Sequence, residues 1–188
     1  MKVIQTDLPG VLLFEPTVHR DPRGFFLETW REESSRAAGI VMPFVQDNHS
    51  RSTLGTLRGL HAQVKNPQGK LVRVIEGEIF DVAVDIRPGS PTYRRWVGER
   101  LGADNFLQLW IPPGFAHGFC VLSEAAQVEY KCTAYYDRDD EIAISWRDPD
   151  LAIEWPIADP LVSEKDRNAP RLRDLEAMLG GHGRGHGR

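Results

Sequence analysis

The sequence predicts an all-β fold of the sandwich or barrel type, and three observations support it. Gly and Pro contribute 17 and 13 of the 188 residues, and they separate short runs of β-branched and aromatic residues. The alternate residues Phe80, Val82 and Val84 are apolar, which is typical of a strand with one buried face. Inside the core of the chain, only residues 31–38, which end at Gly39, have the pattern of a helix. Many short strands divided by turns form sandwiches or barrels.

The clearest pair of strands lies on either side of Gly77, within residues 70–90. We expect a tight turn at this glycine to join the two strands. Other turns are predicted where Gly, Pro, Asn and Asp gather, as at residues 112–114. The remaining predicted strands are, in order, 11–14, 25–30, 43–49, 57–63, 94–101, 106–111, 117–122, 126–136 and 141–146.

The length of the chain predicts a single domain of ordinary size. We expect this domain to comprise residues 1–178. The pattern changes after Pro156, and residues 159–178 are expected to wrap the domain in short helical turns. Residues 179–188 are rich in Gly, His and Arg, and we expect them to form a disordered tail.

Composition and charge exclude several classes of function. The formal net charge is −4 and the pI about 5.9, which argues against a large nucleic-acid-binding face. No apolar stretch approaches the roughly 20 residues of a membrane helix, and the first residues do not resemble a signal peptide. Cys120 and Cys132 form no CxxC motif and are expected to be structural thiols in the reducing cytoplasm. The sequence also contains no P-loop, GxGxxG or GxSxG motif.

Two histidines lie in segments with the character of strands. Alternation places Gly59, His61 and Gln63 on one face of a strand. The spacing Pro112-x-Gly114-x-x-His117 resembles the second motif of the cupin family, and the segment around Gly77 resembles the end of the first. This resemblance implies a double-stranded β-helix, or jelly roll, with a few short peripheral helices and a site in the mouth of the barrel.

The first cupin motif normally supplies two His and one Glu to a metal ion. Here Gln63 occupies the second His position, and Lys70 stands seven positions before Gly77, where the Glu is expected. An ammonium cannot ligate a metal, and an amide replaces imidazole poorly. We therefore expect neither metal nor cofactor, and a metal-dependent cupin oxygenase is disfavoured. An ammonium at this position can instead stabilise an enolate oxygen.

A series of motifs carries a closer resemblance, which extends over residues 2–170. The motifs are Asp21-x-Arg23-Gly24-x-Phe26-x-Glu28, Gln46-Asp47-Asn48-x-Ser50, Leu57-Arg58-Gly59-Leu60-His61, Gln68-x-Lys70-Leu71-Val72, Pro113-Gly114-Phe115-Ala116-His117-Gly118-Phe119, Tyr130-Lys131-Cys132-Thr133-x-Tyr135-Tyr136 and Ser163-x-Lys165-Asp166. Together and in this order they resemble the dTDP-4-dehydrorhamnose 3,5-epimerase family. The departures from the family pattern are few, and the tail is one of them.

The resemblance implies inversion at C3 and C5 of dTDP-4-dehydro-6-deoxy-D-glucose, which gives dTDP-4-dehydro-L-rhamnose. Both carbons flank the C4 ketone, so removal of either proton gives an enolate. The reaction needs a base on one face of the sugar, an acid on the other and a positive group near O4. By resemblance, His61 is the base, Asp166 its orienting partner, Lys70 the enolate stabiliser and Tyr130 the acid.

The resemblance also implies the groups that bind the substrate, all of which are contacts to the dTDP-sugar. The residues expected at the diphosphate or sugar oxygens are Arg23, Arg58, His117 and Lys165. Those expected at thymine or deoxyribose are Glu28, Gln46, Asn48 and Glu141, and Phe26 and Tyr136 are expected to sandwich the thymine. The family is dimeric, so we expect a homodimer in which the segment from Arg23 to Glu28 reaches the site of the neighbouring subunit.

Two alternatives remain open from the sequence. One is a sibling enzyme, either a single-site 3- or 5-epimerase of another dTDP-4-keto-deoxysugar or a ketoisomerase. The other is a non-catalytic cupin that binds a sugar nucleotide. Tyr130 favours two inversions, because a proton must return to the opposite face. The chemically competent His61 and Lys70 favour an enzyme over a binding protein.

Overall fold

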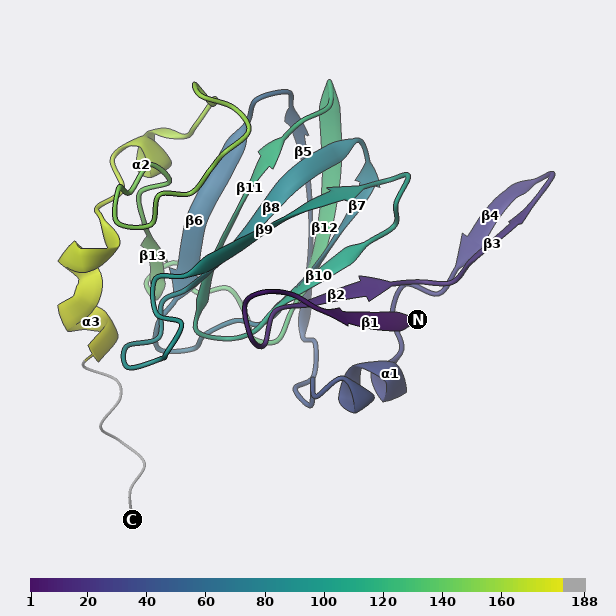
Figure 1. Cartoon of the computed structure of the whole chain (residues 1–188), viewed down its shortest axis with the longest axis horizontal. Helices are drawn as coiled ribbons and strands as arrows, with labels where there is room; N and C mark the ends of the chain where they lie inside the picture. The colour runs from purple at the N-terminus through teal and green to yellow at the C-terminus, as the bar shows by residue number, and fades with distance from the viewer. Residues whose placement is uncertain (181–188) are drawn as a thin grey trace, which may run out of the picture.

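The computed structural model describes residues 1–180 and has two antiparallel sheets that face each other (Figure 1). In spatial order, the six-stranded sheet contains β1 (Lys2–Gln5), β2 (Leu12–Glu15), β10 (Gln108–Ile111), β7 (Lys70–Glu76), β12 (Ala125–Cys132) and β5 (Gln46–Thr53). The five-stranded sheet contains β13 (Glu141–Ala143), β6 (Leu57–Gln63), β11 (Phe115–Val121), β8 (Glu78–Asp85) and β9 (Trp96–Gly102). The predicted jelly roll of the cupin type is confirmed.

The inward faces of the two sheets build the main core. Val72 and Val128 from the six-stranded sheet pack in one buried cluster with Ala83 and Phe119 from the five-stranded sheet. Side chains alternate along β7 and β12, so Lys70, two residues before Val72, and Tyr130, two residues after Val128, also point inward. One end of the barrel interior is therefore apolar, while polar side chains occupy the equivalent inward positions at the other end.

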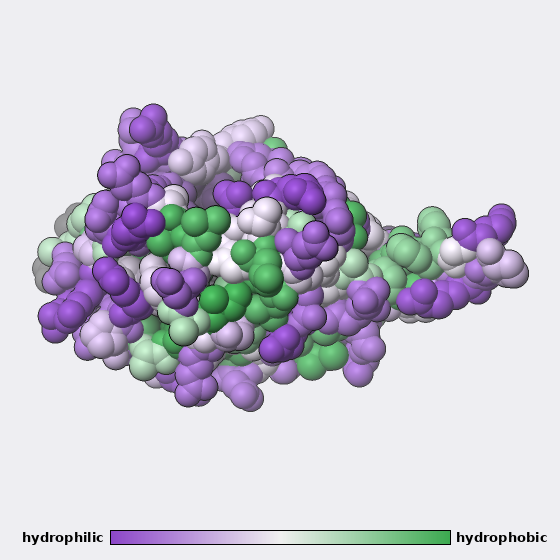
Figure 2. All heavy atoms as spheres, turned by 90° about the horizontal axis from the view of Figure 1, so that it is seen from above, coloured by the Kyte–Doolittle hydropathy of each residue, from purple (hydrophilic) through white to green (hydrophobic). Residues whose placement is uncertain are grey.

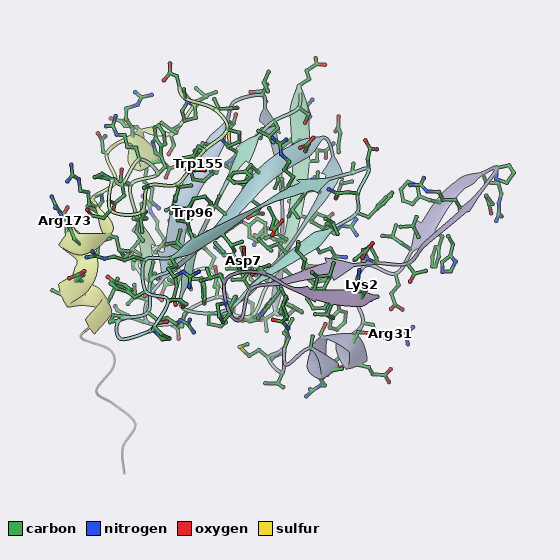
Figure 3. All side chains as sticks on the ribbon, viewed as in Figure 1. Lys2, Asp7, Arg31, Trp96, Trp155 and Arg173 are labelled. Atoms are coloured by element: carbon green, nitrogen blue, oxygen red, sulfur yellow. The ribbon has the colours of Figure 1, made fainter. Side chains whose placement is uncertain are left out.

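A second apolar cluster lies on the outer side of the five-stranded sheet. The helical segments after residue 160 are α2 (Glu164–Arg167), the 3-10 helix η1 (Leu172–Leu175) and α3 (Glu176–Gly180), and the last two cover this cluster. Leu172 and Leu179 are buried against this face, and Trp96 and Trp155 pack on the same cluster (Figure 3). The predicted boundary of the tail at residue 179 is wrong, because α3 includes residues 179 and 180 and Leu179 is buried. Residues 181–188 lie outside the described part of the chain.

Most predicted strands are observed within a few residues of their expected limits, and 57–63 coincides with β6. The expected pairing across Gly77 is wrong. β7 pairs with β10 and β12, whereas β8 pairs with β9 and β11, so the chain passes from one sheet to the other at this glycine. Gly77 has φ +78°, and a Cβ there would overlap the carbonyl of Ala125. The glycine therefore forms a corner between sheets and not a hairpin turn.

Strands β3 (Val18–Asp21) and β4 (Gly24–Leu27) form a separate hairpin that projects from the body, on the opposite side from α3 (Figure 1). Its surface is a mixture of polar and apolar groups (Figure 2). Phe26 is 72% exposed there. The short helix α1 (Glu32–Ala37) follows the hairpin and lies within the predicted 31–38. Strands β1 and β3 escaped prediction because their side chains are mostly exposed and lack apolar alternation. Within residues 1–180, no helix combines the length and the apolar character needed to cross a membrane.

Candidate active site

A cavity of about 660 Å³ lies in the polar end of the barrel. Its walls come from both sheets, with β5, β7 and β12 on one side and β6 and β11 on the other, and residues 161–166 complete the rim. The chain brings together here eleven of the fourteen side chains predicted for the site. They are Gln46, Asn48, Arg58, His61, Lys70, His117, Tyr130, Tyr136, Glu141 and Asp166, which line the cavity, and Lys165, which contacts Glu141.

His61 and Asp166 form a hydrogen-bonded pair at one wall of the cavity. His61 Nε2 lies 2.6 Å from Asp166 Oδ1, and the Asp166 side chain is 4% exposed. Ser163 caps α2 by accepting a hydrogen bond from the Asp166 backbone, which fixes the carboxylate beneath the ring. Burial tends to raise the pKa of Asp166, but the hydrogen bonds from His61 and Ser163 outweigh it and hold the pKa below its usual value. Asp166 is therefore ionised, so His61 Nε2 donates and Nδ1 is left for a ligand.

A bulge in β6 directs both Arg58 and His61 into the cavity. Side chains three residues apart on a regular strand point to opposite faces. Here His61 is opposite His117, while Arg58 is opposite Phe119, so three residues of β6 span two residues of β11. Arg58 Nε also donates to Ser52 Oγ at 2.9 Å. The extra residue thus places a guanidinium and an imidazole on the same wall.

Lys70 and Tyr130 occupy the opposite wall, on the neighbouring strands β7 and β12. Lys70 Nζ lies 6.0 Å from the centre of the Tyr130 ring. Burial lowers the pKa of Lys70, while Cys132, Glu141 and Asp81 act in the opposite direction. Burial also raises the pKa of Tyr130, so its phenol stays protonated at neutral pH. A negative charge that develops beside Lys70 would find an ammonium with few competing partners.

A second His–Asp pair lies beside the first, and the sequence analysis missed its carboxylate. His117 Nε2 is 2.6 Å from Oδ1 of Asp81, which is completely buried in β8. Phe80 and Val82 face the outer side of the sheet, so Asp81 is a charged residue at an inward position. An acidic residue in the middle of the otherwise apolar stretch 79–84 was the signal in the sequence.

A group of polar contacts forms the rim of the cavity around Glu141. Its Oε2 accepts hydrogen bonds from Lys165 Nζ and, at 3.3 Å, from the Tyr136 hydroxyl. Its Oε1 lies 3.9 Å from His61 Nδ1. Glu141 is thus adjacent to His61 as well as to Tyr136 and Lys165. Gln46 extends the rim, because its Oε1 accepts from the Tyr136 backbone at 2.8 Å.

Three predicted site residues do not reach the cavity of their own chain. Arg23 pairs with Asp21 at the tip of the hairpin, and Phe26 is exposed beside it. Glu28 pairs with Arg31 just beyond the hairpin. The hairpin projects away from the barrel, and these three residues therefore lie outside the cavity of their own chain (Figure 1).

Gln63, at the position of a cupin metal ligand, is committed to loop structure. Its Nε2 donates to the carbonyls of Asn66 and Tyr135, and its Oε1 accepts from the Asp137 backbone. Among residues 1–180, no group of three or more His, Cys, Asp or Glu side chains is arranged to hold a metal ion.

Comparisons with known proteins place this site in a family. The model of the dTDP-4-dehydrorhamnose 3,5-epimerase family matches residues 5–174. A dTDP-4-dehydrorhamnose 3,5-epimerase of Pseudomonas aeruginosa is 54% identical over 180 residues, covering 95% of this chain and 99% of the relative.

Two solved structures extend the comparison. The dTDP-6-deoxy-D-glucose-3,5-epimerase of Legionella pneumophila, in complex with dTDP-4-keto-L-rhamnose, is 49% identical with a TM-score of 0.92, over 95% of this chain and 96% of that one. A 3'-monoepimerase of Streptomyces bikiniensis, in complex with dTDP-quinovose, is 35% identical with a TM-score of 0.86, over 93% and 90%. Similarity at this level over nearly the whole of each chain shows that the protein belongs to the dTDP-4-dehydrorhamnose 3,5-epimerase family.

Proposed function

We propose that the protein is an isomerase that inverts C3 and C5 of dTDP-4-dehydro-6-deoxy-D-glucose, forming dTDP-4-dehydro-L-rhamnose for dTDP-L-rhamnose biosynthesis. The observation that carries the proposal is the arrangement of the cavity. A carboxylate-oriented imidazole lies on one sheet, and a phenol beside an ammonium lies on the other. The proposal also rests on the relatives of the same name.

His61 removes the proton from carbon. Its Nε2 is held by Asp166, so Nδ1 receives the proton and the carboxylate stabilises the imidazolium that forms. The electron pair of the broken C–H bond moves into the C4 carbonyl and gives an enolate. Lys70 carries the positive charge that stabilises the enolate oxygen, and the partial burial of its side chain in the cavity strengthens that interaction.

Tyr130 returns a proton to the opposite face of the same carbon. Burial raises the pKa of Tyr130, so its phenol is a weak acid toward water, but an enolate carbon is basic enough to take its proton. The C4 ketone then re-forms with the configuration inverted. Repetition at the second carbon completes the reaction, and exchange with water restores His61 and Tyr130 to their starting protonation states.

The nucleotide is held at the rim. Arg58, Lys165 and His117 supply contacts to the diphosphate or sugar oxygens. Gln46, Asn48, Glu141 and Tyr136 contact the nucleoside. Phe26 and Arg23, with Glu28, reach the site of a second copy in a homodimer. Their exposure on a projecting hairpin supports this assignment.

The same proposal places the protein in the cytoplasm. Its two cysteines, Cys120 and Cys132, are both free and buried in the described structure. Disulfides are rare in reducing compartments, so unpaired cysteines fit that location.

Incubation with dTDP-4-dehydro-6-deoxy-D-glucose in D₂O, followed by proton NMR, tests the proposed reaction. We expect deuterium at both C3 and C5 and the signals of dTDP-4-dehydro-L-rhamnose. Exchange at one carbon alone would identify a single-site epimerase. Binding of the substrate without exchange at either carbon would show a non-catalytic sugar-nucleotide-binding protein and overturn the proposal.

A further inference from the structure

The second His–Asp pair is not used in the proton transfers described above. His117 on β11 lies directly opposite His61 on β6 in the strand register. The Cβ atoms of such partners are about 4.5–5.5 Å apart, so both rings reach the same part of a ligand. Because His61 acts on the sugar carbons, the sugar ring is the part of the substrate nearest His117.

The carboxylate of Asp81 is expected to destabilise the fold at this position. Its side chain is fully buried in β8, Oδ1 contacts His117, and Oδ2 has no hydrogen-bond partner among the described residues. Burial of a carboxylate with an unsatisfied oxygen destabilises a fold, whereas an apolar residue there would pack at no such cost. The neighbouring inward position Ala83 shows that this strand accepts small apolar side chains. Residues that destabilise a fold locally are typical of functional sites, so the burial of this carboxylate indicates a role in the cavity.

The contact with Asp81 determines which nitrogen of His117 faces the ligand. A carboxylate can only accept, so Nε2 must carry the proton that the 2.6 Å contact uses. Nδ1 is then the nitrogen that remains for the substrate. The exposed part of His117 is small, and the ring lines the cavity. The pair therefore presents one defined atom at one defined place.

We infer that Asp81 is a positioning residue of the epimerase site, which acts by fixing the orientation and the protonated nitrogen of His117 so that Nδ1 contacts the sugar ring. This inference rests on the proposed function for the identity of the sugar. It assigns His117 to the sugar and not to the diphosphate.

Asp85 provides a matched control on the same strand. It is also completely buried, but its carboxylate accepts from Arg87, Ser90 and Thr92, away from the cavity. Asp85→Asn therefore perturbs a buried carboxylate of β8 without touching His117. A merely structural role for Asp81 predicts that the two positions behave alike.

The first test needs no substrate, and its deciding measurement is made on the wild-type protein. Proton–nitrogen NMR of protein labelled with 15N-histidine reports which ring nitrogen is protonated. We expect His117 to carry a proton on Nε2 in the wild type, and Asp81→Leu to abolish this preference while Asp85→Asn leaves it unchanged. A wild-type His117 with an unprotonated Nε2 would overturn the inference, even if Asp81→Leu failed to fold. This result does not depend on whether the protein is an epimerase.

The second test separates turnover from binding. We expect Asp81→Leu to lower kcat by about 10- to 100-fold, the range seen when the outer partner of a ligating histidine is removed. The affinity for dTDP alone should stay within about twofold, because the nucleoside diphosphate is held elsewhere. Asp81→Asn, whose amide oxygen can accept from Nε2, should recover part of the loss. Unchanged kcat, an equal loss of dTDP affinity, or a similar fall of kcat in folded Asp85→Asn would each contradict the assignment.

Discussion

The two His–Asp pairs of this protein have the same distance of 2.6 Å between His Nε2 and Asp Oδ1, but they differ in exposure and in the element that supplies the carboxylate. The His61 side chain is 26% exposed, and its carboxylate comes from a helix far along the chain. His117 is 7% exposed, and its carboxylate comes from the adjacent strand. An imidazole that transfers protons to and from a substrate must be accessible, whereas an imidazole that positions a substrate benefits from rigid surroundings that exclude water. The surroundings of each pair, and not the bond within it, therefore separate the two roles.

The largest effect is expected from His61→Asn. Removal of the base should lower kcat by up to about 10⁴-fold and abolish deuterium exchange at both carbons. Affinity for dTDP, measured by calorimetry, should change little. The matched substitution His117→Asn should leave exchange detectable. Equal losses in the two variants would remove the distinction between the pairs.

Tyr130→Phe should follow, with a loss of product formation of about 10²–10³-fold. Because His61 still removes the proton, and can return deuterium to the same face, exchange should outlast inversion. Proton NMR in D₂O measures both rates in one sample. Loss of exchange and inversion in equal measure would place Tyr130 in the abstraction step as well.

Asp166→Asn should lower kcat by about 10²-fold, since an amide cannot stabilise the imidazolium as a carboxylate does. The loss should appear in kcat more than in KM, because Asp166 acts through His61. Steady-state kinetics would check this split. An effect of Asp81→Asn larger than that of Asp166→Asn would reverse the ranking of the two pairs.

The smallest effect concerns stability in acid. The pKa of Asp166 lies below its ordinary value of 3.8, so its carboxylate favours the folded state above that pH. This contribution is lost as the pH falls below 3.8 and through the folded-state pKa. Between pH 5 and strongly acidic solution, thermal melts should therefore shift less in Asp166→Asn than in the wild type. Parallel curves would show that the charge of Asp166 is no more favoured in the folded state than in the unfolded chain.

The pattern of β-branched and aromatic runs between turn residues predicted most strands, because it marks the segments whose side chains are buried. It could not report which sheet a strand joins, and this is why the pairing expected across Gly77 was wrong. The exposed edge strands β1 and β3 carry no such pattern, and they form through pairing with β2 and β4.

Some residues of the site could be predicted from the sequence, whereas several contacts between them could not. His61, Lys70 and Tyr130 stood out through motifs, but the pairing of His61 with Asp166, 105 positions away, was predicted only from the family resemblance. Asp81 stands outside those motifs, and its partner is fixed by the register of β8 and β11, which the sequence does not reveal. The direction of the hairpin that carries Phe26 could likewise be seen only in three dimensions.

The bulge in β6 reverses the alternation of side chains along the strand. Before it, one parity of residue number points into the barrel, and after it the other parity does, so Arg58 and His61 share a wall. Deletion of a single residue between them would turn one of the two toward solvent or into the outer core while leaving every other strand intact. A design that transplants this site into another barrel must therefore retain the extra residue of the bulge. An alignment of distant relatives by hydrophobic pattern must likewise allow for that residue.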